Sequence, residues 1–197
     1  EISIVALGRL GVKQLTAGSD LDLLIIYDTA PDVVSNGQRK LPAASYVLRL
    51  AQTMVSWIST PTAEGTLYDV DLRLRPEGQA SAIAISIDRL SAYFDQDAWI
   101  WEKQALTKAR PVAGDASLSR KIQQLVNRII NQNHPKDRLV QAVFDMRQRI
   151  QKQQKPASQW HLRQVSGGLT DIDLLIQAWR LQYGSLFSCS GQPARVI

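Results

Sequence analysis

GSDLDLLIIYD, residues 18–28, places two carboxylates two residues apart at the start of an apolar run rich in β-branched side chains. Side chains on a strand alternate between its faces, so Asp20 and Asp22 point to one side while Leu21 and Leu23 point to the other. Two neighbouring acids in an apolar setting repel each other unless a cation neutralises them. Carboxylate oxygens suit Mg²⁺, which completes its shell with water and substrate phosphate. The run therefore predicts a strand that begins at a phosphate-handling metal site; a solvated acid pair at a strand end is the alternative.

Glycine turns come before this strand. Residues 2–7, ISIVAL, read as a short buried strand that ends at Gly8, and residues 8–11 (GRLG) read as a tight turn. Gly18 and Ser19 form a second turn directly before the acids. Glycine lets the backbone approach a phosphate closely, and the N–H groups of a turn can donate hydrogen bonds to it. A phosphate-binding turn and a plain connecting turn are both compatible with this pattern.

A third acid lies further along the chain, in residues 67–75 (LYDVDLRLR). The strict alternation of polar and apolar residues predicts a strand whose polar face carries Asp69, Asp71, Arg73 and Arg75. A carboxylate followed by arginines can hold a metal beside a polyphosphate, because guanidinium groups suit phosphate oxygens. A solvent-facing polar side is again the alternative. Taken with the acid pair and the turns, the pattern favours a two-metal site for phosphoryl or nucleotidyl transfer.

Five stretches resemble, in the same order, the glutamine synthetase adenylyltransferase family: ALGRLG…TAGSDLDLLIIYD, YDVDLRLRPEG, AWIWEKQALTKARPVAGD, DMRQRI and SGGLTDIDLLIQ. Family members carry two nucleotidyltransferase halves, and these forms are more similar to the C-terminal, adenylylating half than to the adenylyl-removing one. The resemblance implies an α+β fold. Residues 1–90 would form a polymerase-beta-like nucleotidyltransferase palm, a short mixed sheet with helices. Residues 91–197 would form an α-helical lobe.

The resemblance also implies site residues. Asp20, Asp22 and Asp71 match the catalytic, metal-binding carboxylates of the polymerase-beta-like superfamily, which would hold two Mg²⁺ ions. The positions that match nucleotide-binding parts of the family pattern are Gly8, Gly18, Ser19, Arg73, Arg75, Glu102, Lys108 and Arg110. Departures from the family pattern fall at Gln14, Ser81, Lys103, His161 and Asp173. None of them is one of the three carboxylates.

The activity that the resemblance implies is transfer of AMP from ATP to a tyrosine hydroxyl of glutamine synthetase, which regulates nitrogen assimilation. Glutamine synthetase and ATP would be its partners, and the PII signal protein would act through the full-length chain. Two alternatives stay open. One is phosphorolytic removal of AMP from modified glutamine synthetase on the same scaffold. The other is a regulatory module that binds glutamine synthetase or PII without catalysis.

Composition fits a cytoplasmic domain. The 197 residues are 45% hydrophobic and 21% charged, which allows a sizeable core. The net charge of +5 suits a nucleotide or an acidic protein and is too diffuse to indicate nucleic acid. The single cysteine, Cys189, allows no internal disulfide, and neither a membrane-spanning run nor a leader is apparent. Because the chain begins inside a strand without methionine, we expect a segment of a longer polypeptide.

Helical spacing predicts the remaining elements. The expected helices cover about residues 43–58, 88–95, 97–109, 115–132, 136–153 and 174–183, with a weaker strand at 82–87 and a linker at 151–156. The expected local roles are Asp88 as an N-cap, Trp99 and Trp101 as packing anchors, His134 as a capping or surface residue, and Thr170 or Asp171 as an N-cap. A functional alternative for Asp171, together with the preceding glycine pair, is contact with nucleotide or target.

Overall fold

The computed structural model describes residues 1–30, 32–66, 68–74, 76, 82–153, 158 and 160–187, the side chains of 185–187 excepted. The chain folds into two compact units. The first contains Glu1–Ala98 and Lys108–Val126, and the second contains Trp99–Thr107 and Asn127–Ile197. The division into domains at residue 90 stays a prediction.

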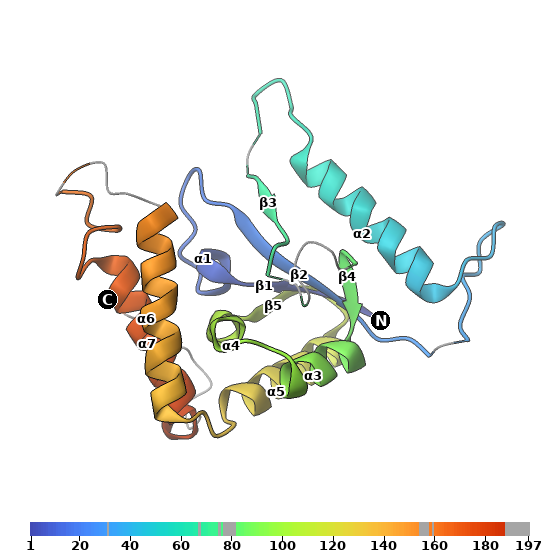
Figure 1. Cartoon of the computed structure of the whole chain (residues 1–197). Helices are drawn as coiled ribbons and strands as arrows, with labels where there is room; N and C mark the ends of the chain where they lie inside the picture. Colours follow the sequence, from blue (N-terminus) through green and yellow to red (C-terminus); the bar gives the residue numbers. More distant parts are fainter. Residues whose placement is uncertain are drawn as a thin grey trace. The chain divides into compact units, whose positions relative to one another are not determined.

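A mixed sheet of five strands organises the first unit (Figure 1). Its strands are β1 (Ile2–Ala6), β2 (Leu21–Tyr27), β3 (Val70–Asp71), β4 (Ala84–Ser86) and β5 (Arg110–Gly114). Strand β1 pairs antiparallel with both β2 and β5, whereas β3 and β4 each pair in parallel with β2. With the seven helices found among the described residues, this sheet confirms the predicted α+β class.

The middle of β2 is buried on both faces, which explains its continuous apolar run. Ile25 packs in a cluster with Val47 and Ala51 of helix α2 (Ala43–Ser59) and with Ala84 of β4. The opposite face carries Ser3 of β1, which is fully buried and lies 3.0 Å, Oγ to Oγ, from Ser119. Ser119 belongs to helix α5 (Ala116–Ile130), so helices from different parts of the sequence cover the two faces.

The predicted strand at 67–75 is wrong in its length. Only Val70–Asp71 forms a strand, and the chain turns at Arg73. The Asp71 carboxylate accepts a hydrogen bond from the Arg73 backbone N–H at 2.8 Å. Such an aspartate turn replaces the ladder hydrogen bonds that a longer strand would need. Residues 67 and 75 lie outside the described residues.

The segment after the predicted helix at 97–109 differs more strongly from expectation. The helix is shorter, α4 (Ile100–Leu106), and strand β5 follows it where a purely helical pattern was expected. Strand β5 pairs with β1 alone and so lies at an edge of the sheet. Pro111 is tolerated there because an edge strand has one side without ladder bonds.

Most of the other predicted helices are confirmed. Helix α1 (Gly8–Gly11) is a single turn between β1 and β2. Helix α3 (Ile87–Gln96) begins after Ser86, whose Oγ accepts from the Arg89 N–H, so Ser86 is the N-cap and Asp88 belongs to the first turn. Helix α5 begins after Asp115, whose Oδ1 accepts from the backbone N–H groups of residues 117 and 118.

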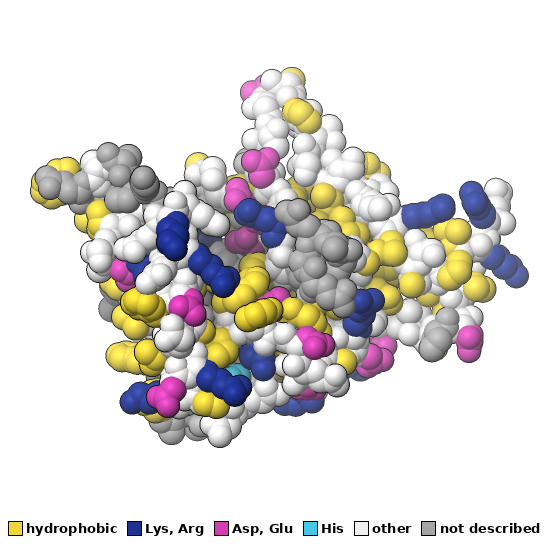
Figure 2. Space-filling view, in the orientation of Figure 1, with side chains coloured by type: hydrophobic (Ala, Val, Ile, Leu, Met, Phe, Trp, Pro, Cys, Tyr) yellow, Lys and Arg dark blue, Asp and Glu magenta, His cyan; other side chains and the backbone are white. Residues whose placement is uncertain are grey.

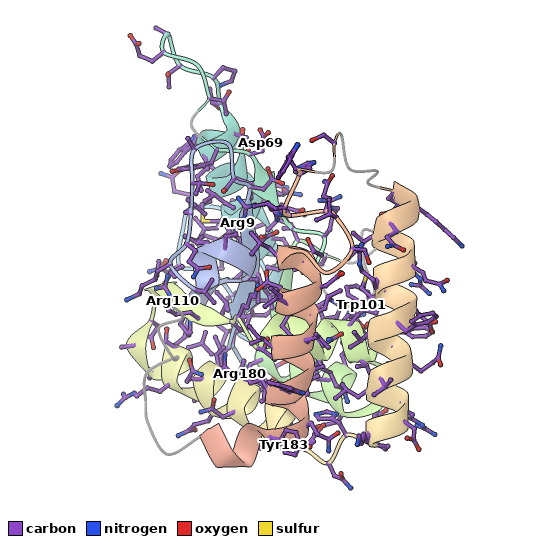
Figure 3. The ribbon with its side chains drawn as sticks, turned by 90° about the vertical axis from the view of Figure 1, so that its left-hand side faces the viewer. Arg9, Asp69, Trp101, Arg110, Arg180 and Tyr183 are labelled. Carbon is purple, nitrogen blue, oxygen red and sulfur yellow. The ribbon has the colours of Figure 1, made fainter. Side chains whose placement is uncertain are left out.

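The second unit contains the helices α4, α6 (Lys136–Gln153) and α7 (Leu169–Phe187). Arg180 of α7 donates to the Thr107 carbonyl at the end of α4, and the two helices lie together in Figure 3. An ion pair between Arg147 and Asp171 joins α6 to α7. Residues 151–153 of the predicted linker are helical, and 154–156 lie outside the described residues.

Three local expectations in this unit have different outcomes. Trp99 is 68% exposed and does not anchor the core, whereas Trp101 is half-buried. His134 is buried rather than at the surface, and its Nε2 lies 3.1 Å from the Ile129 carbonyl, so the expected capping of a helix end is confirmed. Helix α7 begins before Asp171, whose Oδ2 accepts from the Gly167 N–H inside the first turn.

Within the described residues, no helix combines the length and the apolar character that crossing a membrane requires.

Candidate active site

The parallel register between β2 and β3 brings two of the predicted carboxylates together. Leu21 pairs with Val70, and Asp22 pairs with Asp71. Residues directly opposite in a parallel pair lie on the same face of neighbouring strands, about 4.8 Å apart. The pairing begins with the hydrogen bond from the Leu21 N–H to the Asp69 carbonyl, 2.7 Å long. Acids 49 residues apart in the sequence are therefore neighbours, and Figure 2 shows acidic and basic side chains gathered near β3.

Gly8 lies against the Asp22 side chain. A Cβ at Gly8 would be only 2.0 Å from Oδ2 of Asp22, and the backbone there has a φ of +49°. Both facts require glycine: a side chain would displace the carboxylate, and L-residues rarely adopt this φ. The Leu7 N–H also donates to the Asp22 carbonyl at 2.9 Å, so the end of β1 fixes the start of β2.

The loop between α1 and β2 is closed by hydroxyl groups. The Ser19 side chain is buried, and its Oγ accepts from the Thr16 N–H and lies 2.9 Å from Thr16 Oγ1. Arg9 of α1 donates from one terminal nitrogen to both hydroxyls, at 3.1 and 3.0 Å. Gly18 has a φ of +75°, with open space around it, so it serves the turn by conformation. This clamped turn leads directly to Asp20, which is exposed.

The Asp71 carboxylate is engaged by Arg73. Nε of Arg73 lies 2.8 Å and a terminal nitrogen 2.5 Å from Oδ2 of Asp71, and the Arg73 backbone N–H binds Oδ1. The Arg73 side chain is 69% exposed, while that of Asp71 is 14% exposed. The exposed Arg73 side chain therefore lies between the Asp71 carboxylate and solvent, and little packing holds it there.

The acids differ in their electrostatic environment. Burial raises the pKa of Asp22, and repulsion from Asp71 and Asp20 raises it further, against the smaller opposing effect of Arg73 and Arg9. The hydrogen bonds from Arg73 lower the pKa of Asp71 in spite of its burial. The three carboxylates thus share one field, and Asp22 carries the charge that is hardest to maintain.

Their chemistry fits a divalent cation, which would relieve the repulsion at Asp22 and would take oxygen ligands. As the side chains stand, no three acidic, histidine or cysteine side chains among the described residues form a ready metal site. Asp71 would have to exchange Arg73 for the metal. The carboxylate oxygens are suitable ligands for such a cation, but their side chains would have to rearrange when it binds.

Comparison with known proteins identifies the family of this chain. The family model described as glutamate-ammonia ligase adenylyltransferase matches residues 1–125. The chain belongs to this family.

Its relatives are much longer proteins. The chain is similar to the bifunctional glutamine synthetase adenylyltransferase/adenylyl-removing enzyme of Bartonella quintana, at 36% identity over 100% of this chain and 20% of the relative. It is similar to the enzymes of the same name from Brucella suis and Agrobacterium fabrum, each at 37% identity, over 90% and 89% of this chain and 18% of each relative. The chain thus spans about a fifth of the length of the curated relatives it matches.

Not every residue that the adenylyltransferase family pattern indicates is available at the acids. Arg110 donates to the carbonyls of Leu10 and Gly11, both at 2.8 Å, and thereby holds α1 (Figure 3). A Cβ at Gly11 would be 1.9 Å from the Lys108 carbonyl oxygen, so the chain before β5 also packs directly on this turn. The arrangement gives Arg110 a structural role; its nucleotide-binding role stays a prediction.

Glu102 lies in the second unit, is buried, and its Oε2 accepts from the Trp99 N–H at the start of α4, 2.8 Å away. This contact is the glutamate half of a capping box, since the Trp99 side chain has no acceptor for the other half. Arg75 lies outside the described residues.

Sequence reasoning missed Arg9. The residue lies in the turn after β1 and joins the loop hydroxyls to the field of Asp22. The sequence signal was a basic residue between Gly8 and the acid pair, in a turn already considered for phosphate.

Proposed function

We propose that this chain is an adenylyltransferase domain that moves AMP from ATP to a tyrosine hydroxyl of glutamine synthetase and releases pyrophosphate. The observation that carries the proposal is the parallel register that brings Asp22 beside Asp71, with Asp20 near enough to add to the repulsion at Asp22. Membership of the adenylyltransferase family and the names of the relatives support this reaction and this protein substrate. The domain would fold as a polymerase-beta-like palm and would work in the cytoplasm, with PII acting through the longer protein.

Asp20, Asp22 and Asp71 would hold Mg²⁺, in two sites by analogy with the family. When bound, Mg²⁺ would neutralise phosphate charge and lower the pKa of an incoming hydroxyl. The Gly18–Ser19 turn would bind the terminal phosphates through its backbone. Arg73, released from Asp71, would move toward the charge that develops on the leaving pyrophosphate.

The bond changes are those of one displacement. The tyrosine oxygen forms a bond to the α-phosphorus, and the bond from that phosphorus to the bridging oxygen of the pyrophosphate breaks. Pyrophosphate leaves with the electron pair. The hydroxyl proton goes to a base, for which Asp71 is the candidate. The hydrogen bonds from Arg73 lower the pKa of Asp71. A bound Mg²⁺ would take over this effect, and it would also lower the pKa of the hydroxyl that loses the proton.

The test is transfer of label from α-labelled ATP to purified glutamine synthetase in the presence of Mg²⁺. We expect the parent chain to transfer label and Asp22→Asn to lose transfer while keeping its fold by circular dichroism. Arg49→Gln, an exposed change on α2, is the control for loss of a charge. Undiminished transfer by Asp22→Asn would refute the assignment of the acids.

The reverse reaction is the second candidate, because the relatives are named as both adenylylating and adenylyl-removing enzymes. In that reaction a phosphate oxygen would form a bond to the phosphorus of the AMP group, and the bond from that phosphorus to the tyrosine oxygen would break. The products would be ADP and the tyrosine hydroxyl, which regains a proton. Release of label from pre-adenylylated glutamine synthetase on addition of phosphate, without transfer from ATP, would assign the chain to this direction. Absence of both reactions, with glutamine synthetase still bound, would favour a binding module.

A further inference from the structure

The arginines around the acids differ in the groups that accept their side-chain hydrogen bonds. Arg73 is held by the Asp71 carboxylate, and Arg110 is held by two backbone carbonyls. Arg9 differs from both: in the part of the chain that the structure describes, the hydrogen bonds of its side chain run only to the hydroxyls of Thr16 and Ser19. Among the described residues, no carboxylate accepts a hydrogen bond from Arg9.

The two groups that accept hydrogen bonds from the Arg9 side chain are neutral, although Arg9 also lies in the field of Asp22. A guanidinium has five N–H donors, and the two hydroxyls engage only one terminal nitrogen. Hydroxyl groups are weak competitors for a cation, because charge-assisted hydrogen bonds to an anion are about twice as strong as neutral ones. An anion with several oxygens could therefore bind the remaining edge of the guanidinium without displacing it from the loop.

The position of Arg9 restricts which anion this is. Arg9 acts on the charge of Asp22 and is fixed to the turn that leads to Asp20. A simple anion would be repelled by two carboxylates so near, whereas a polyphosphate that brings its own divalent cation would not. The clamp on Ser19 also holds the loop backbone in place, so Arg9 and the turn are presented together.

We propose that Arg9 is a phosphate-binding residue of this site, which contacts the polyphosphate of a metal–nucleoside triphosphate at the Gly18–Ser19 turn. The inference rests on the proposed function and adds to it a residue that the family pattern did not select. Arg9 gives the site its preference for a polyphosphate over a nucleoside. Arg73 serves Asp71, and Arg110 serves the fold, so their losses have different consequences.

The experiment is equilibrium binding of a fluorescent ATP analogue to the full chain with Mg²⁺, with ATP, AMP and adenosine as competitors. We expect Arg9→Gln to weaken ATP binding about tenfold or more, as loss of a charge-assisted hydrogen bond to phosphate predicts. Adenosine binding should stay within about twofold of the parent, because a nucleoside offers Arg9 no anion. Arg49→Gln, which removes an exposed charge from the same unit, should leave all three affinities unchanged.

Two further variants separate charge from support of the loop. Thr16→Val removes one acceptor of the clamp and keeps Arg9, so we expect a much smaller loss of ATP affinity than with Arg9→Gln. Arg9→Lys keeps the positive charge but loses the planar pair of guanidinium donors, so it should bind ATP with intermediate affinity. If Arg9→Gln does not fold, Arg9→Lys is the variant that tests the proposal. Equal losses in Thr16→Val and Arg9→Gln, or a parallel loss of adenosine binding, would show a structural role and overturn the proposal.

The outcomes also distinguish this inference from the proposed function. ATP binding by the parent chain together with unchanged ATP binding by Arg9→Gln overturns the role of Arg9 and leaves the adenylyltransferase assignment standing. A parent chain that binds no ATP with Mg²⁺ overturns the proposed function and this inference with it.

Discussion

Asp22 has the least favourable charge among the site acids. Its side chain is half-buried and is repelled by two other carboxylates. It also packs directly against the backbone of Gly8, which restricts its position. Arg9 and Arg73 offset this cost in part. A carboxylate in such a place lowers the stability of the ligand-free fold, and it also creates a strong negative potential where a cation can bind.

Asp22→Asn should therefore raise the thermal stability of the ligand-free chain while abolishing transfer of label. The amide keeps the size of the side chain and removes the repulsion, so we expect Tm to rise by roughly 2 to 4 °C. Calorimetry at pH 7 without divalent ions measures this. Asp20→Asn, at an exposed position, should change Tm less. A lower Tm for Asp22→Asn would contradict the account of its environment.

Arg73 should compete with metal ions for Asp71. Arg73→Lys keeps the charge but loses the two-pronged contact, so Mn²⁺ should bind roughly two- to fivefold more tightly than in the parent, as suits an exposed ion pair. Electron paramagnetic resonance of free Mn²⁺ gives the affinity. Arg73→Lys combined with Asp71→Asn should show no such gain over Asp71→Asn alone. Equal Mn²⁺ affinities in parent and Arg73→Lys would show that the ion pair does not oppose binding.

The apolar run from Leu21 was enough to predict the strand that carries Asp22, and the alternation around Asp71 was enough to predict an acid on a second strand. The shared face of Asp20 and Asp22 stays a prediction, because Asp20 lies before β2. The sequence could not reveal the register that makes Asp22 and Asp71 neighbours, because pairing between distant strands depends on the whole sheet. Nor could it separate arginines by role. Arg110 and Arg73 look alike as isolated cations, and only their acceptors distinguish them.

At the scale of elements, the errors come from short strands. Pro111 and Gly114 read as chain breaks, yet β5 pairs with β1 as an edge strand, and Gly114 packs so closely that a Cβ would be 2.2 Å from the Ile2 carbonyl oxygen. At β3 the alternation overstated the strand, because the Asp71 side chain makes a turn. Long amphipathic helices were predicted well, and α6 has the predicted bounds.

The cap of α3 offers a test at this scale. Ser86 Oγ accepts from the Arg89 N–H, whereas Asp88 lies inside the first turn. Ser86→Ala should lower the free energy of unfolding by about 1 kcal/mol, as loss of an N-cap does. Asp88→Asn should cost less, because only its interaction with the helix dipole weakens. Urea unfolding measures both, and a larger loss for Asp88→Asn would restore the cap predicted from sequence.

For the molecule as a whole, His134 should make stability depend on pH. Burial lowers the pKa of His134 below its usual 6.5, and Lys103 adds repulsion, against the hydrogen bond from the ring to Ile129. The unfolded chain then binds a proton that the folded chain does not, so the free energy of unfolding falls as pH drops below about 6.5. Denaturant unfolding from pH 7.5 to 5.5 measures the slope.

His134→Gln should flatten this slope, because it removes the ring whose pKa burial lowers. Arg49→Gln, an exposed change on α2, is the control. A slope that His134→Gln leaves unchanged would place the pH dependence elsewhere.

The position of β1 between β2 and β5 determines the order in which its two strand pairs can form during synthesis. Ser3 pairs with Ile26, 23 residues away, and also with Gly114, 111 residues away. Translation proceeds at about 5 to 20 residues per second, so the hairpin of β1 and β2 would wait roughly 5 to 20 s on the ribosome before β5 is made. For that interval the first strand exposes an unpaired edge, of the kind that draws aggregation. Contacts so distant in sequence also form slowly in refolding, so completion of this sheet should be the slow step of renaturation and the stage at which chaperones protect the chain.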